Sequence, residues 1–131
     1  MKNKLLLAGV LASFIWNFYL VSGATLNSSA VLTRVAGGNF DSIPLGLRIA
    51  YGVQTLLIVY QFYFVIRLYQ RNGAWSRNSY LFARIFLALS AVSALVNAVS
   101  RSSAERWNAI AAAIIAIGYY FLGNVNLRPT K

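Results

Sequence analysis

Among the uncharged polar residues that interrupt the apolar stretches of this sequence, six are candidates for a site: Asn17, Gln54, Gln61, Ser90, Ser93 and Asn97. The two glutamines are seven residues apart, and the last three residues follow an i, i+3, i+7 pattern, so each set shares one face of a helix. Together they could line a polar seam that binds a neutral solute or a lipid head group. Because none of them is ionisable, hydrogen bonding between helices is the favoured interpretation.

Few other residues could perform chemistry. The chain has no Cys and no His, and its only acids are Asp41 and Glu105. This excludes thiolate nucleophiles, haem ligation by Cys or His, and zinc sites built on those ligands. Neither acid falls in the middle of an apolar run, so there is no titratable relay for proton-coupled transport and no base for hydrolysis. We therefore expect a protein that is not an enzyme and holds no metal or cofactor.

The composition indicates a membrane protein. The 131 residues are 59% apolar and 11% charged, against about 25% charged in soluble domains. Such a chain cannot give each helix a charged outer face, so lipid must be its solvent. The net charge of +10 comes from basic residues at the ends of apolar runs. There they favour orientation signals and contacts with anionic lipid, and binding to nucleic acid is not expected.

The sequence predicts an all-α membrane protein, a four-transmembrane-helix bundle that forms a single integral membrane domain over residues 1–131. A helix of about 20 residues crosses a hydrocarbon core of about 30 Å. Four runs meet this length, and we place the spans at about residues 5–24, 44–68, 81–99 and 103–123.

The first run also resembles a signal peptide. Basic residues precede it, and Ser22-Gly23-Ala24 could serve as a cleavage site. However, its apolar stretch is longer than the usual 7–15 residues and contains Trp16 and Asn17. The length favours a retained helix, with cleavage as the alternative.

The connections carry turn and capping signals. In the first loop, Ser29 could cap a short surface helix over residues 30–36, which Gly37 would close in the left-handed conformation. Asn72-Gly73 predicts a tight turn between the second and third spans. Ser102 and Glu105 fit a capping box, in which each side chain accepts a backbone N–H of the other residue. Asp41 precedes the second span and could support its start in a similar way.

Counting basic residues predicts the orientation. If the N-terminus lies inside, the inner side holds eight of them: Lys2, Lys4, Arg67, Arg71, Arg77, Arg84, Arg128 and Lys131. The outer side holds only Arg34, Arg48, Arg101 and Arg106, so both termini are expected in the cytoplasm. Aromatic residues gather near both interfaces, Trp16 near the outer one and Tyr119 near the inner one. The expected location is a cell membrane, of the bacterial cytoplasmic type.

Arginines have two expected roles. Arg67, Arg71, Arg77 and Arg84 are candidate contacts for anionic lipids at the cytoplasmic face. Arg48 lies about one turn inside the second span. It either extends to the head groups or forms an outer ion pair with Glu105 or Asp41.

These features leave two functional hypotheses of different classes. The leading one is a non-enzymatic membrane protein that acts through association, as an accessory subunit of a membrane complex or a self-associating scaffold. The alternative is a small carrier or channel for a neutral polar solute or lipid that uses the six polar residues. An enzyme acting on lipid-linked substrates has little support. A cavity open to one side and lined by the polar set would favour the carrier, whereas a tightly packed interior would favour the subunit.

Overall fold

The computed structural model describes residues 3–125. These residues form five α-helices and two short 3₁₀ turns, joined by loops. The α-helices are α1 (Lys4–Thr25), α2 (Leu45–Gln70), α3 (Arg77–Ala98), α4 (Ser103–Arg106) and α5 (Asn108–Leu122), and the 3₁₀ turns are η1 (Leu32–Arg34) and η2 (Ala36–Gly38). There is no strand among these residues. Three helices, α1, α2 and α3, are long and apolar enough to cross a membrane.

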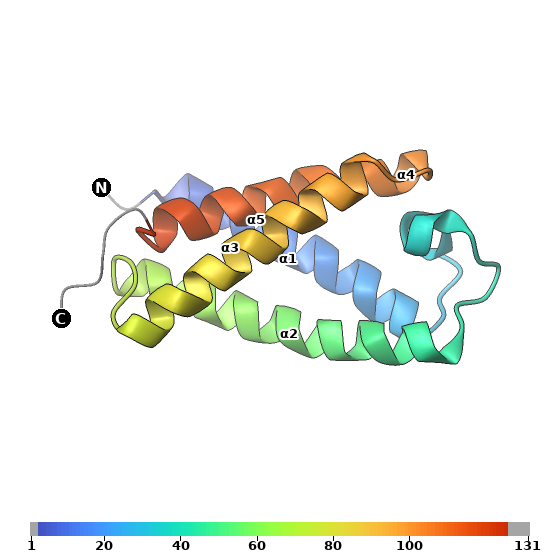
Figure 1. Cartoon of the computed structure of the whole chain (residues 1–131), viewed down its shortest axis with the longest axis horizontal. Coiled ribbons are helices and arrows are strands. Elements are labelled where there is room, and N and C mark those ends of the chain that lie inside the picture. The colour runs from blue at the N-terminus through green and yellow to red at the C-terminus, as the bar shows by residue number, and fades with distance from the viewer. Residues whose placement is uncertain (1–2, 126–131) are drawn as a thin grey trace.

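The helices form two antiparallel pairs that join through α1 and α5. Helix α1 packs against α2 and α5, and α3 packs against α5. Figure 1 shows the start of α1 and the end of α5 at one end of the bundle, together with the turn between α2 and α3; we call this the terminal end. The loop between α1 and α2 lies with α4 at the opposite end, the loop end. Helices α2 and α3 meet at the terminal end and diverge toward the loop end (Figure 1).

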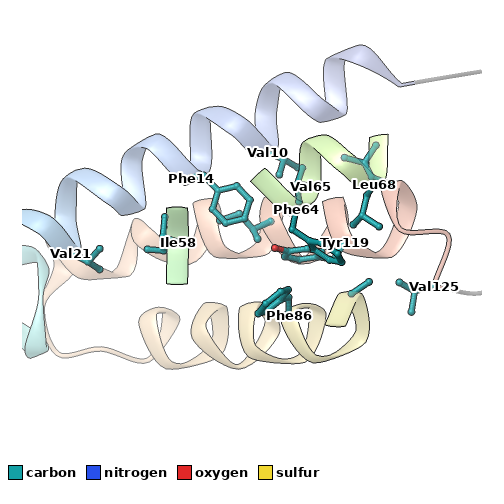
Figure 2. Close-up of a cluster of buried hydrophobic side chains, with 13 residues drawn as sticks. Val10, Phe14, Val21, Ile58, Phe64, Val65, Leu68, Phe86, Tyr119 and Val125 are labelled. Atoms are coloured by element: carbon teal, nitrogen blue, oxygen red, sulfur yellow. The ribbon is translucent and has the colours of Figure 1, made fainter. Parts of the chain in front are cut away.

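Aromatic side chains from all four long helices fill the core at the terminal half of the bundle (Figure 2). Tyr119 of α5 is fully buried, and its ring lies 6.4 Å from Phe14 of α1, 6.4 Å from Phe64 of α2 and 5.6 Å from Phe86 of α3. Centroid distances of this size are typical of favourable aromatic pairs. Tyr119 therefore lies at the centre of the core, rather than at a lipid interface as its position in the sequence predicts.

Close packing of α1 on α5 depends on Gly118. A Cβ atom at this position would lie 2.3 Å from Cγ2 of Val10, which is itself fully buried. Valine is branched at Cβ and cannot easily rotate away. Glycine is therefore the residue that allows the two helix backbones to approach, as small residues commonly do between membrane helices.

Two of the observed helices differ in extent from the predicted spans. Helix α3 begins at Arg77, four residues before the predicted start, because Ser76 and Ser79 form a reciprocal capping box. The predicted fourth span divides at Trp107 into α4 and α5, although Trp107 itself keeps helical dihedral angles of −64° and −24°. Alone, α5 has 15 residues and extends about 22 Å. The two pieces together provide the fourth predicted helix.

The predicted surface helix in the first loop forms as η1 and η2 instead of one α-helix. Val35 between them adopts extended dihedral angles, which β-branched residues favour, and this interrupts the helix. Gly37 does take the predicted left-handed conformation, with φ of 72°. The turn at Asn72-Gly73 is also confirmed, since both residues have positive φ.

We predict that Gly118→Ala destabilises the protein by about 1–3 kcal/mol, the usual cost of overpacking a core. The matched control is Gly46→Ala in α2, where a Cβ atom would meet nothing within 4 Å. That variant should have unchanged or slightly raised stability. Thermal unfolding of both variants in the same detergent would check this, and equal midpoints would contradict the proposed close contact.

Candidate functional site: a polar groove between the helices

All six polar residues singled out by the sequence line two adjoining cavities. A cavity of about 260 Å³ is bordered by Asn17, Gln54, Gln61, Ser90 and Ser93, among others. A second cavity of about 180 Å³, nearer the loop end, is bordered by Asn17, Gln54, Ser93 and Asn97. Because the two cavities share three lining residues, we treat them as one feature and call it the polar groove.

Few of these six side chains hold helices together. Only Gln61 bonds to another helix, accepting the Tyr119 hydroxyl at 3.1 Å. Asn17 and Asn97 each donate to a carbonyl one turn earlier in their own helix, at 2.9 and 2.8 Å. Within residues 3–125, Gln54 and the hydroxyl of Ser90 have no hydrogen-bond partner. Hydrogen bonding between helices therefore accounts for one member of the set.

The polar groove opens sideways between α2 and α3. Leu57 of α2 and Leu89 of α3 line the 260 Å³ cavity and are themselves 38% and 52% exposed. These side chains belong to both the cavity wall and the outer surface of the bundle, so they form the rim of a lateral mouth. Helices α2 and α3 also diverge toward the loop end in Figure 1, which agrees with a side-facing position of this mouth.

Aromatic side chains close the groove toward the terminal end. Gln61 forms its polar floor and is held there by the hydroxyl of the buried Tyr119. Below them, Phe64 of α2 packs against Phe82 and Phe86 of α3 with ring centroids 6.4 and 5.8 Å apart. Figure 2 shows Phe64, Tyr119 and Phe86 close together in the core. The groove therefore reaches past the middle of the bundle and stops there.

Asn108 organises the other end of the groove. It is 4% exposed, accepts the indole N–H of Trp16 at 3.2 Å, and donates to the carbonyl of Arg34 at 2.9 Å. The Arg34 guanidinium lies 5.5 Å from the Trp16 ring centre and donates to the carbonyl of Ala104 at 3.2 Å. These contacts join α1, the first loop and the α4–α5 segment into one cap.

Glu105 forms only half of the predicted capping box. Its backbone N–H donates to the Ser102 hydroxyl at 3.2 Å, as expected. Its carboxylate accepts the N–H of Gly37 at 3.0 Å and the hydroxyl of Ser100, rather than the N–H of Ser102. The N–H of Ser102 donates instead to the hydroxyl of Ser100 at 3.2 Å. Glu105 thus fastens the first loop to the start of α4.

Arg48 and Glu105 take separate partners in the structure. The Nε of Arg48 donates to the carbonyl of Thr25 at 2.9 Å, which connects the start of α2 to the end of α1. Asp41 is exposed, and α2 begins after Pro44 without a side-chain cap. The sequence could not anticipate these choices because they depend on how the first loop folds.

The four candidate lipid-contacting arginines lie toward the terminal end, most of them beside aromatic rings. Arg67 lies over Tyr63, Arg71 over Trp75 and Arg84 over Tyr80, at 5.9, 5.4 and 5.6 Å from the ring centres. Arg77 is exposed at the first residue of α3. Lys2, Arg128 and Lys131 belong to the same predicted basic side but lie outside the described residues.

Comparisons with known proteins add no functional information. No protein-family model matches the chain, and no curated protein or solved structure is significantly similar to it. The geometry of the polar groove is therefore the basis for assigning a function. It presents hydrogen-bond donors and acceptors without a charged side chain in its 260 Å³ part. This chemistry suits recognition of an uncharged polar group.

The contacts of Glu105 lead to a prediction. Glu105→Ala should lose about 1–2 kcal/mol of stability, because the Gly37 N–H and the Ser100 hydroxyl lose their acceptor. Glu105→Gln should change stability by less than about 0.5 kcal/mol, since the Gly37 N–H and the Ser100 hydroxyl donate to the same carboxylate oxygen and an amide oxygen can accept both. Thermal unfolding in detergent measures both effects.

Asp41→Ala is the control, since this exposed acid caps no helix, and its stability should not change. Ser102→Ala combined with Glu105→Ala should lose less than the sum of the two single variants, because both residues join the first loop to α4. A Glu105→Gln protein as unstable as Glu105→Ala would instead show that the negative charge is required.

Proposed function

We propose that this protein spans a cell membrane four times with both termini in the cytoplasm, and that it is a non-enzymatic carrier for a neutral polar solute or lipid. The observation that carries the functional part is the polar groove, which gathers all six polar residues around cavities open to one side of the bundle. The sequence alone favoured an accessory subunit or scaffold. A tightly packed interior would have supported that hypothesis, and the groove supports the carrier.

The membrane part of the proposal is supported by length, apolar surface and charge. Helices α1, α2 and α3 are long enough to cross the hydrocarbon core. Large apolar side chains such as Leu56, Leu95 and Val99 are 73%, 68% and 82% exposed, which is favourable only in contact with lipid. Basic residues with aromatic neighbours at the terminal end fit an interface with anionic lipid on the cytoplasmic side.

The groove suits a carrier better than a channel. A channel needs a continuous polar path, whereas here the core around Tyr119 and Phe64 closes the terminal half. The groove ends at the aromatic core and is entered from the side, between α2 and α3. A closed-ended site of this kind suits binding and release of one molecule at a time. No charged group lies in the deeper cavity, so the proposed ligand carries no net charge where it enters the bundle.

The topology can be tested with reporter fusions. We expect cytoplasmic reporters to be active at the N-terminus, at the turn near Asn72 and at the C-terminus. External reporters should be active near Asn27 and Ser103. An external C-terminus, or a mature protein that begins after Ala24, would contradict the four-span topology.

A cavity-filling variant tests ligand binding. Ser93 lines both cavities, so Ser93→Leu should obstruct the groove, whereas Ala91→Leu adds a leucine to an exposed position of the same helix. Native mass spectrometry of protein extracted in mild detergent should find an uncharged molecule on the wild type and on Ala91→Leu. Its occupancy on Ser93→Leu should fall at least tenfold. A wild-type protein that retains nothing, or equal occupancy in both variants, would refute the carrier proposal.

A further inference from the structure

Two nearly buried polar side chains have hydrogen-bonding capacity directed to the polar groove rather than to the protein. Ser90 is 8% exposed, and no residue of the described chain bonds to its hydroxyl. Gln61 is 9% exposed; its oxygen accepts the Tyr119 hydroxyl, and its amide nitrogen has no partner within residues 3–125. Every fully buried side-chain N or O atom within residues 3–125 has a hydrogen-bond partner, so the Ser90 hydroxyl and the Gln61 amide nitrogen keep some surface that faces the groove. A polar group in such a nearly buried position gains from a partner, and a molecule in the groove can provide one. These two residues point to a ligand with hydroxyl or amide groups.

The depth of these groups limits the route by which a ligand can reach them. Gln61 lies about 24 Å along α2 from Leu45, in a helix about 39 Å long. At the loop end the groove is bordered by Arg34, Glu105 and Asn108, so an acyl chain on that route would lie against charged and polar side chains. The lateral mouth between Leu57 and Leu89 is apolar on both of its rims. An apolar rim repels a hydrated solute but accepts acyl chains.

We propose that the ligand is a lipid with an uncharged hydroxyl- or amide-bearing head, which enters laterally between α2 and α3. This inference rests on the proposed carrier function and specifies its substrate class. The head binds Ser90, Gln61 and Gln54 inside the 260 Å³ cavity, and the acyl chains pass between Leu57 and Leu89 into the bilayer. A cavity of about 150 Å³ holds benzene, so this one has room for a small polar head.

The 260 Å³ cavity has no Lys or Arg in its lining, which favours an uncharged lipid over a phospholipid. Phosphate recognition relies on Arg or Lys, helix N-termini or clustered backbone N–H groups. Among the residues lining the 260 Å³ cavity there is no charged side chain. Arg34 borders the neighbouring cavity, but its guanidinium lies over Trp16 and bonds to Ala104. A phosphate at the depth of Gln61 would lose its hydration without compensation.

Binding can be measured with a dioleoylglycerol probe that carries a diazirine in one acyl chain, in phosphatidylcholine nanodiscs containing the full chain. We expect photolabelling on α2 and α3 near Leu57 and Leu89, competed by unlabelled dioleoylglycerol. Equimolar dioleoyl phosphatidic acid, which has the same chains and an anionic head, should compete at least tenfold less well. Ser90→Ala should reduce labelling about fivefold, whereas Ser103→Ala, an exposed serine outside the groove, should not.

The route can be tested separately, since the chain contains no cysteine of its own. In Leu57→Cys/Leu89→Cys, a cleavable bismaleimide should bridge the mouth and abolish labelling, and cleavage of the linker should restore it. Each single-cysteine variant treated in the same way is the control and should retain labelling. Labelling that persists with the mouth bridged would overturn lateral entry.

Two further outcomes separate this inference from the carrier proposal. If radiolabelled glycerol binds and is lost in Ser93→Leu while dioleoylglycerol does not label, the carrier proposal stands and the lipid inference is wrong. If phosphatidic acid competes as well as dioleoylglycerol, the uncharged head is wrong. If neither probe binds and the wild type retains no molecule, both proposals fail.

Discussion

The buried hydroxyl of Tyr119 is the constraint on which the arrangement of the helices depends. Its ring contacts α1, α2 and α3 at once, through Phe14, Phe64 and Phe86. A fully buried hydroxyl needs a partner inside the protein, and Gln61 provides it. This bond fixes the rotation of α2 relative to α5. With α2 fixed, Gln54 and Leu57 face the space beside α3, so the position of the groove follows from the packing of a single side chain.

The sequence predicted the helices well because each depends on local information. Apolar length located α1 and α2 to within two residues of their observed ends, and Asn72-Gly73 located the turn that follows. The start of α3 was missed because its capping partner at the third helical position is Ser79, whereas the usual motif has Glu or Gln there. The break at Trp107 was missed because that residue keeps helical dihedral angles, so no proline or glycine marks it.

The sequence predicted the residues that line the candidate site, but it did not predict the residues that close the site at its two ends. Helical spacing placed Gln54 with Gln61, and Ser90 with Ser93 and Asn97, because side chains three, four or seven residues apart share a face. Their convergence from different helices depends on long-range packing, which spacing within one helix does not reveal. Asn108 and Arg34 are joined across 74 positions of the chain, and Trp16 reaches Asn108 across 92. Trp16 and Tyr119 are of the residue types that gather at membrane interfaces, so the sequence predicted an interfacial position for both and not their contacts inside the bundle.

The cap and the aromatic core tie the two helix pairs together at both ends of the groove. Glu105, Asn108 and Ser102 fasten the first loop to the α4–α5 segment, and Phe64 with Phe86 joins α2 to α3. A rigid-body hinge needs one free end, and neither end of this groove is free. The space between α2 and α3 can therefore widen only by bending of the two helices between these attachments. The mechanical compliance of the molecule is concentrated at mid-helix, beside Leu57 and Leu89.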